Sequence, residues 1–333
     1  MRLRPLLLVS GTAVVVAALA VGGMTISQAA TGSAAPAIVA PKAVALGGAP
    51  YIFPATSKNP NPVTVMKTAG IKAFTLAFIL SDGGCNPAWD GSGSLQGSAI
   101  VNRINAIRNE GGDVVVSFGG AAGKKLGNVC KDATALAGAY QKVIDAYKLR
   151  AIDIDLEAGE VPQGAKVVGA LKIVKKKNPS VQTIMTLGVG TDGLPAGREG
   201  KLPAQDAAAG SPVDVWTIMP FDFGGKNDAN MGNLSVSVTK KVHAQLKSTH
   251  SGMSDAQIYA KQGISSMNGK TDVGETVKVA DFQTMLNFAK QNHLARFTFW
   301  TVNRDQGGCG GSSDTCSGIS QKPLDFTKVI GQF

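Results

Sequence analysis

Short apolar runs alternate with amphipathic stretches along the chain from residue 50 onward. The apolar runs predict eight strands, at 51–54, 71–80, 113–118, 151–157, 181–189, 213–223, 263–267 and 296–302. Stretches with helical periodicity lie between them and predict helices near 62–69, 98–110, 131–147, 163–177, 200–209, 232–248, 281–292 and 324–331. The runs are continuously apolar, as strands buried on both faces of a parallel sheet are.

Eight strand–helix units in strict alternation predict an α/β fold, a (β/α)8 TIM barrel in a single domain. A doubly wound sheet is the alternative, but no G-x-G-x-x-G follows the first strand. Only about 13 residues separate Met267 from the helix near 281, so we expect no large insertion module there. The groove above the barrel should therefore be open.

The N-terminal segment has the pattern of a secretory signal. Arg2 and Arg4 precede an apolar stretch from 6 to 24, and small residues follow at 27–30. This predicts a signal peptide over 1–30, with an uncleaved membrane anchor as the alternative. Residues 31–48 are rich in Ala, Pro and Gly and predict a linker or tail, and 49–333 would form the (β/α)8 domain. We expect a secreted, extracellular protein with no membrane attachment in its mature form.

Composition narrows the chemistry. Of 333 residues, 44% are hydrophobic and the net charge is +10, but the Lys residues are spread along the chain, so we expect no nucleic-acid partner. Three His residues argue against a zinc site or a His-based triad. Four Cys in an exported chain predict two disulfides out of three pairings, and we favour Cys309–Cys316 with Cys85–Cys130 over zinc. We expect no cofactor, no metal and a monomer.

The fourth predicted strand carries three carboxylates. Asp153, Asp155 and Glu157 stand at i, i+2 and i+4, so they share one face, about 6–7 Å apart, while the apolar residues between them face the helices. Burial of three acids on one face forces at least one pKa upward, which suits a general acid. Solvated surface acids and a Mg²⁺ or Ca²⁺ site are the alternatives.

These residues resemble the DGxDxDxE signature of the family-18 glycoside hydrolases, the chitinases and their relatives. The segment LRAIDIDLE carries the match, and three other stretches agree in order, namely Ser117-Phe118-Gly119-Gly120 (SxGG), Met219-Pro220-Phe221-Asp222 (MxYD) and Trp300 at the end of the last strand. The resemblance covers about residues 50–331 and is closest to compact bacterial and archaeal catalytic domains. Arg150, Ala151 and Phe221 depart from the pattern, and Phe221 lacks the hydroxyl of the family's Tyr.

The resemblance implies a role for each matching residue. Glu157 would be the general acid, Asp155 would orient the 2-acetamido group of the substrate, and Asp153 would share charge or a proton with Asp155. The remaining substrate-binding candidates are Asp222, Phe221, Met219, Trp300, Ser117, Gly119 and Gly120, and we add Trp89 as a stacking residue at a distant subsite or a cover for the core edge. Without a neighbouring His, Ser117 is not expected to be a nucleophile.

The function expected from this resemblance is hydrolysis of chitin or chitooligosaccharides by a retaining, substrate-assisted mechanism, with internal cleavage in an open groove. An endo-β-N-acetylglucosaminidase acting on other acetamido-glycans, a catalytically weak chitin-binding barrel and a basic wall- or nucleic-acid-binding protein are the alternatives. A basic surface should also favour acetylated chitin over cationic chitosan.

Overall fold

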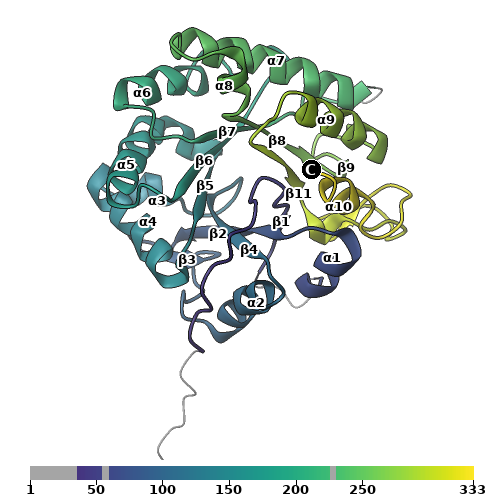
Figure 1. Cartoon of the computed structure of the whole chain (residues 1–333), viewed down its shortest axis with the longest axis horizontal. Helices are drawn as coiled ribbons and strands as arrows, with labels where there is room; N and C mark the ends of the chain where they lie inside the picture. The colour runs from purple at the N-terminus through teal and green to yellow at the C-terminus, as the bar shows by residue number, and fades with distance from the viewer. Residues whose placement is uncertain (1–35, 55–59, 226–229) are drawn as a thin grey trace, which may run out of the picture. The chain divides into compact units, whose positions relative to one another are not determined.

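The structure is a computed structural model that describes residues 36–54, 60–225 and 230–333. Figure 1 shows the strands at the centre of this compact unit and the helices around them. The predicted signal peptide, 1–30, lies outside the described residues. Within the described part, no helix is both long and apolar enough to span a bilayer.

The central sheet contains the eight predicted strands. They are β1 (Tyr51–Ile52), β2 (Ala73–Ser81), β4 (Asp113–Gly119), β5 (Ala151–Leu156), β6 (Gln182–Gly188), β7 (Val215–Met219), β8 (Gln262–Met267) and β11 (Arg296–Trp300). They run parallel in the order β1-β2-β4-β5-β6-β7-β8-β11. This is the predicted (β/α)8 barrel, because each strand lies beside the next barrel strand in the sequence.

The barrel closes between β1 and β11 through side chains. Among the described residues, no backbone ladder joins the two strands, but the Thr301 hydroxyl donates to the Tyr51 carbonyl at 2.6 Å and the Thr298 hydroxyl donates to the Ala49 carbonyl at 2.7 Å. The buried carbonyls in and just before the short first strand are therefore satisfied by threonines in and just after the last strand, as buried polar groups require.

The helices surround the barrel. They are α1 (Pro62–Ala69), α2 (Ser98–Asn109), α3 (Leu126–Val129), α4 (Ala133–Tyr147), α5 (Gly164–Lys177), α6 (Leu202–Ala209), α7 (Met231–Thr249), α8 (Asp255–Tyr259), α9 (Val279–Gln291) and α10 (Asp325–Ile330). The capping of α1 shows why a helix starts where it does: the Asn61 side chain accepts from two backbone N–H groups, Pro62 opens the helix, and Gly70 ends it at φ 75°.

Apolar residues form two separate layers. The larger cluster lies between the strands and the helices. A smaller cluster fills the amino-terminal end of the barrel interior and consists of Leu46, Ala49, Ala73, Val115, Ala151, Ile184 and Val215. The carboxyl-terminal end of the interior is lined by the polar side chains described below, so chemistry is confined to that end.

The segment 36–48, which the sequence predicts to be a linker, packs against the barrel. It belongs to the same compact unit as the strands and helices, and Leu46 is buried in the interior cluster. Arg108 donates to the Val39 carbonyl at 2.7 Å, and Arg150 donates to the carbonyls of Lys42 and Val44. The Ala/Pro/Gly composition therefore concealed a segment fixed through its backbone carbonyls and through the buried side chain of Leu46. We call 36–48 the basal segment.

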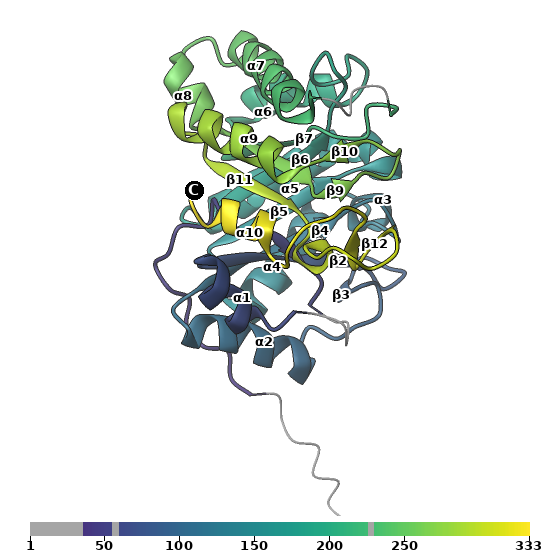
Figure 2. The same cartoon turned by 90° about the vertical axis from the view of Figure 1, so that its right-hand side faces the viewer.

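The loops at the carboxyl-terminal ends of the strands carry small elements that periodicity did not predict. They are β3 (Pro87–Trp89), η1 (Ala158–Gln163), η2 (Glu199–Lys201), η4 (Val302–Arg304), the hairpin β9 (Gly269–Lys270) with β10 (Thr276–Val277), and the hairpin β12 (Ser312–Ser313) with β13 (Cys316–Ser317). Figure 2 shows β9, β10 and β12 on one side of the barrel and the basal segment on the other. As predicted, 268–278 holds a short hairpin instead of an inserted module.

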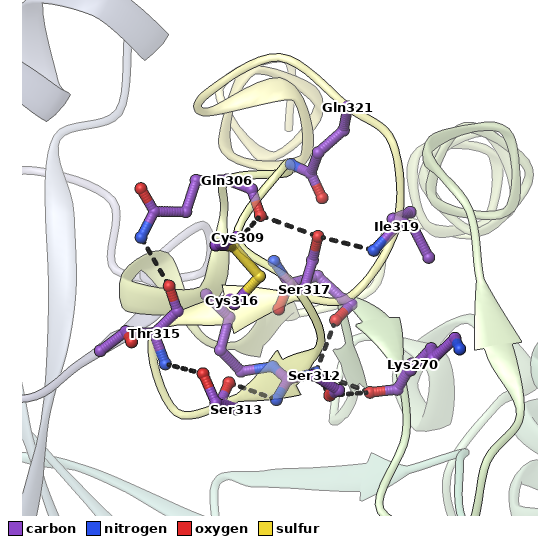
Figure 3. The surroundings of a disulfide bond; sticks show 12 residues. Lys270, Gln306, Cys309, Ser312, Ser313, Thr315, Cys316, Ser317, Ile319 and Gln321 are labelled. Carbon is purple, nitrogen blue, oxygen red and sulfur yellow. Dashed lines mark hydrogen bonds between the residues drawn. A yellow bond between two sulfur atoms is a disulfide. The ribbon is translucent and has the colours of Figure 1, made fainter.

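Both predicted disulfides are present. Cys85–Cys130 joins the loop after β2 to the end of α3, and Cys309–Cys316 closes the loop that leads into β13. Figure 3 shows the second bond beside Ser312, whose hydroxyl donates to the Lys270 carbonyl at 3.1 Å. This disulfide therefore fixes a loop that supports the β9–β10 hairpin.

Candidate active site

Strand β5 places the three predicted carboxylates at the carboxyl-terminal end of the barrel. Asp153 is in register with Ser117 on β4, and Asp155 is in register with Gly119 on β4 and Thr186 on β6. Asp153 and Asp155 are buried, whereas Glu157 directly follows β5 and is half-buried. The alternation along one strand therefore produces a column of acids that rises from the interior to the mouth.

Asp153 is held by three hydroxyl groups. Tyr51 and Ser117 each donate to its Oδ2 at 2.7 Å, and Thr186 donates to its Oδ1 at 2.7 Å. Buried polar groups need hydrogen-bond partners, and these three hydroxyls satisfy the carboxyl group of Asp153 inside the barrel. The acid at the base of the column is thus held in place by donors from three strands.

Asp155 is in the opposite situation. It is 3% exposed, and its Oδ1 accepts no hydrogen bond from any described residue. Burial raises its pKa well above the usual range, and the charges of Glu157 and Asp153 raise it further, against the lowering effect of Lys125. Burial therefore favours the protonated form of Asp155, and its unpartnered oxygen is free for a ligand donor.

Glu157 has the pKa expected of an acid that works near neutral pH. Burial raises its pKa to about 7, Lys125 opposes this rise, and Asp222 and Asp272 add to it. Solvated acids are therefore not the correct description of this strand, because burial is the largest cause of the shift for both Glu157 and Asp155.

The two glycines after Phe118 permit the close packing of β4 on β5. Gly119 has φ +100°, and a Cβ there would come within 2.2 Å of the Asp155 carbonyl. The N–H of Gly120 donates to the same carbonyl at 2.8 Å. Both glycines adopt the left-handed region, which residues with a Cβ avoid. They therefore position the backbone of Asp155.

Trp300 ends β11 at the floor of the mouth. Its ring stacks on Phe78 with centroids 5.4 Å apart and an angle of 16°, and Phe53 packs edge-on at 5.0 Å. Tyr51 lies 5.8 Å away, which connects the aromatic group to Asp153. These rings hold a half-buried Trp300 in a fixed orientation beside the acids.

The residues after β7 approach the acids from another side. Met219 is 8% exposed, Phe221 is half-buried, and Asp222 is exposed with φ 59°. The Asp222 N–H donates to Glu275 Oε2 at 2.8 Å, and Asp222 Oδ1 accepts a long 3.4 Å bond from Val273 N–H. The charge of Asp222 raises the pKa of Glu157. The structure therefore brings Asp222 close enough to Glu157 to act on it, as the sequence predicted.

Trp89 corrects one prediction. It is 1% exposed on β3, and its indole N–H donates to the Tyr147 hydroxyl at 2.7 Å. Its ring packs 6.1 Å from that of Tyr147. A buried indole with its polar atom satisfied cannot stack on a sugar, so Trp89 is a core residue and not a substrate-binding one.

Four site residues were not singled out from the sequence. Tyr51 and Thr186 lie within predicted strands, but nothing in a single sequence marks a hydroxyl that faces an acid across the barrel. Lys125 and Glu160 are buried charges in the loops after β4 and β5, at 3% and 2% exposure. Their burial is what marks them as site residues, and burial cannot be seen in the sequence.

The arrangement suits proton transfer better than metal binding. No three His, Cys, Asp or Glu side chains in the described ranges are grouped as they would be to hold a metal ion. The site instead combines a hydrogen-bonded carboxyl group, a buried carboxyl with a free oxygen, an acid with a pKa of about 7 and a flat aromatic floor. Such a site can protonate a glycosidic oxygen, with the carboxylic acid as proton donor and the aromatic surface under the sugar.

Comparisons with known proteins agree with this geometry. The structure is similar to active domain 2 of a chitinase from Pyrococcus furiosus, with a TM-score of 0.79 and 31% identity over 90% of this chain and 96% of that one. The sequence is 30% identical to a probable bifunctional chitinase/lysozyme of Escherichia coli over 86% of this chain, and 30% identical to Endochitinase 11 of Metarhizium anisopliae over 77%. The chain spans 34% and 52% of the length of these two relatives. No protein-family model matches it.

Proposed function

The chain belongs to the family-18 glycoside hydrolases, the chitinase family, and on that premise we propose that it hydrolyses β-1,4-linked N-acetylglucosamine polymers with Glu157 as general acid. The observation that carries the proposal is the state of the column on β5. Asp153 is held by three hydroxyls, Asp155 is buried with a free oxygen, and Glu157 has a pKa of about 7.

In the first step, protonated Glu157 donates its proton to the glycosidic oxygen. The carbonyl oxygen of the substrate's own 2-acetamido group attacks the anomeric carbon, and the leaving sugar departs with the proton. This produces an oxazolinium ion and a carboxylate on Glu157. Asp155 Oδ1, which has no partner among the described residues, would accept the acetamide N–H and so stabilise the positive charge. Trp300 would lie under the sugar ring.

In the second step, the Glu157 carboxylate takes a proton from water, and the resulting hydroxide attacks the anomeric carbon from the face that the leaving group vacated. The oxazolinium ring opens, the acetamide is restored, and Glu157 regains its proton. Two displacements at one carbon give retention of configuration, without a protein nucleophile.

We propose internal cleavage, because 268–278 holds only the short β9–β10 hairpin above the acids. The similar Pyrococcus domain has been solved with chito-oligosaccharides, and one relative is named an endochitinase, which supports the substrate class. We also propose export, since the N-terminal pattern is that of a signal and the two disulfides suit an oxidising compartment.

The test compares the parent chain with Glu157→Gln on chitin pentamer and hexamer, with products resolved by size and anomer. We expect β-anomers and internal cuts from the parent and a loss of about 10²-fold or more in the variant. Glu110→Gln, on a half-exposed surface glutamate, is the matched control and should cleave like the parent.

Three results would contradict parts of this proposal. Binding of oligomers by the parent without cleavage would indicate a chitin-binding barrel. Initial α-anomers would exclude the acetamide mechanism. Comparable rates on fully deacetylated oligomers would also exclude it, because those substrates lack the attacking oxygen.

A further inference from the structure

A buried cation lies beside the acids of the active site. Lys125, in the loop after β4, is 3% exposed, although Lys is rarely buried without a partner. Its ammonium group donates to the carbonyls of Gly119, at 3.1 Å, and Ala122. Both acceptors are neutral, so hydrogen bonding alone leaves the positive charge of Lys125 unbalanced. Its burial therefore needs another explanation.

Three carboxyl groups across the loop interact with this charge. Lys125 interacts electrostatically with Glu160, Glu157 and Asp155, and these interactions oppose the fall in the Lys125 pKa that burial causes. Glu160, on η1, is also buried, with Oε1 bound to the Gly127 N–H at 2.7 Å and Oε2 unpartnered among the described residues. A single ammonium group thus interacts electrostatically with three acids rather than one.

The contact with Gly119 links this cation to the reaction centre. Gly119 is in register with Asp155, two residues before Glu157. The Cβ that Gly119 lacks would also lie 3.2 Å from Glu160 Oε2. The Lys125 ammonium group, bound to the Gly119 carbonyl, therefore sits where β4, β5 and η1 meet.

We propose that Lys125 is a positioning residue of the active site, whose buried ammonium group holds the glycine turn after β4 and stabilises the carboxylate that forms on Glu157 when it donates its proton. This inference deepens the proposed function and rests on the role of Glu157 as acid. No residue assigned above supplies a positive charge at this point.

Apart from Lys125, the charged groups that act on Glu157 from the described part of the chain are acidic. Asp155 lies below it on β5, and Asp222 and Asp272 face it from the loop after β7 and from the β9–β10 hairpin. Each of them disfavours the Glu157 carboxylate. Among the described groups that act on Glu157, Lys125 is the cation that lowers its pKa against the effect of these acids. Removal of this charge should therefore raise the pKa of Glu157 further.

The first measurement does not need activity. The Glu carboxyl carbons of the full chain are labelled with ¹³C and titrated by NMR, and the Glu157 resonance is assigned by its loss in Glu157→Gln. Lys125→Met should raise the midpoint of Glu157 by about one unit, and Lys125→Arg, which keeps the charge, should return it close to the parent value. Lys124→Met is the matched control, because Lys124 is adjacent, equally charged and exposed.

The second measurement is the pH profile of hydrolysis of chitin hexamer. Lys125→Met should move the alkaline limb of kcat upward with the NMR midpoint and lower kcat several-fold, with KM changing by less than about twofold. A purely structural Lys125 would change the melting temperature and leave the midpoint in place. If Lys125→Met does not fold, Lys125→Gln, which keeps a donor for the Gly119 carbonyl, takes its place.

Two outcomes would overturn the inference. The Glu157 midpoint could stay unchanged in folded Lys125→Met or Lys125→Gln, or Lys125→Arg could shift it as much as Lys125→Met does. The parent chain could instead fail to cleave chitooligosaccharides while the Glu157 midpoint still moves in Lys125→Met. That result would refute the proposed function and support the electrostatic role of Lys125. The two failures are therefore distinguishable.

Discussion

At the scale of single residues, the three acids of β5 differ because their neighbours differ. Asp153 receives three hydroxyl donors, Asp155 is buried with a free oxygen, and Glu157 stands at the mouth among charges of both signs. Acidic residues at alternate positions of one strand therefore have different surroundings, and burial raises the pKa of both Asp155 and Glu157.

The pH dependence follows from Glu157. Its pKa is raised to about 7, so the protonated acid persists through the mildly acidic range and is lost as the pH rises through 7. We expect kcat to fall on the alkaline side with a midpoint near this value, measured with chitin hexamer at saturating concentration. A flat profile from about pH 6 to 9 would show that Glu157 is not the acid.

Tyr51 can be tested through its hydroxyl. Tyr51→Phe removes one of three donors to Asp153, and a hydrogen bond to a charged group contributes about 1.5–3 kcal/mol. We expect kcat to fall about tenfold or more with little change in KM. Tyr147→Phe, which removes a buried hydroxyl from the Trp89 contact, should lower stability and leave kcat unchanged.

Phe221 offers a gain-of-function test. The hydroxyl that family members carry at this position is absent, and one neutral hydrogen bond is worth about 0.5–1.5 kcal/mol. Phe221→Tyr should therefore raise kcat/KM on acetylated oligomers by about 2- to 12-fold. Phe223→Tyr, on the same loop, should have no such effect, and an equal gain there would argue against a specific contact.

At the scale of elements, the site depends on how closely adjacent strands approach. The turn after β4 reaches the Asp155 carbonyl because residues 119 and 120 have no Cβ, and η1 folds back so that Glu160 binds the start of α3. Loops of the barrel are joined further by Cys85–Cys130. The acids are thus fixed by contacts between neighbouring βα loops.

Gly119→Ala tests this dependence. The new Cβ would lie 2.2 Å from the Asp155 carbonyl in a backbone with φ +100°, so β4 and β5 must separate. We expect activity to fall by at least about 10²-fold, since small misplacements of reacting groups are costly. Gly138→Ala, in α4 where nothing lies within 4 Å of the added Cβ, should retain activity and stabilise the fold by about 0.5–1 kcal/mol.

At the scale of the compact unit, the two ends of the barrel have separate roles. The carboxyl-terminal end holds the acids, and the amino-terminal end is closed by Leu46 and the small apolar residues around it. Arg108, Arg150 and Arg296 all donate to carbonyls of the basal segment. This end therefore contributes stability without touching the substrate.

Removal of the basal segment should separate stability from catalysis. A chain that starts at Gly47 loses the burial of Leu46 and leaves buried arginine donors unpaired, which we expect to lower the free energy of unfolding by about 3 kcal/mol or more. A chain that starts at Pro36 keeps these contacts and is the control. Urea unfolding measures the loss, while kcat of the folded protein should stay the same. Equal stability of both chains would mean that the segment does not close the barrel.

The sequence by itself determined the architecture and the central acids. The period of the apolar runs indicated eight strands and eight helices, because buried parallel strands leave a continuous pattern that does not depend on distant partners. The acids at 153, 155 and 157 share a face because side chains of a strand alternate. Loop lengths and cysteine spacing predicted the lack of a large module after β8 and both disulfides.

Only the tertiary structure decided which side chains meet across the barrel. Tyr51 and Thr186 reach Asp153 from strands 102 and 33 residues away, and no local pattern encodes such distances. The same holds for the burial of Trp89 and Lys125 and for the attachment of residues 36–48 through backbone carbonyls. Burial and long-range hydrogen bonds are properties of the packed chain, so the sequence placed the acids, and the packing assigned their protonation states.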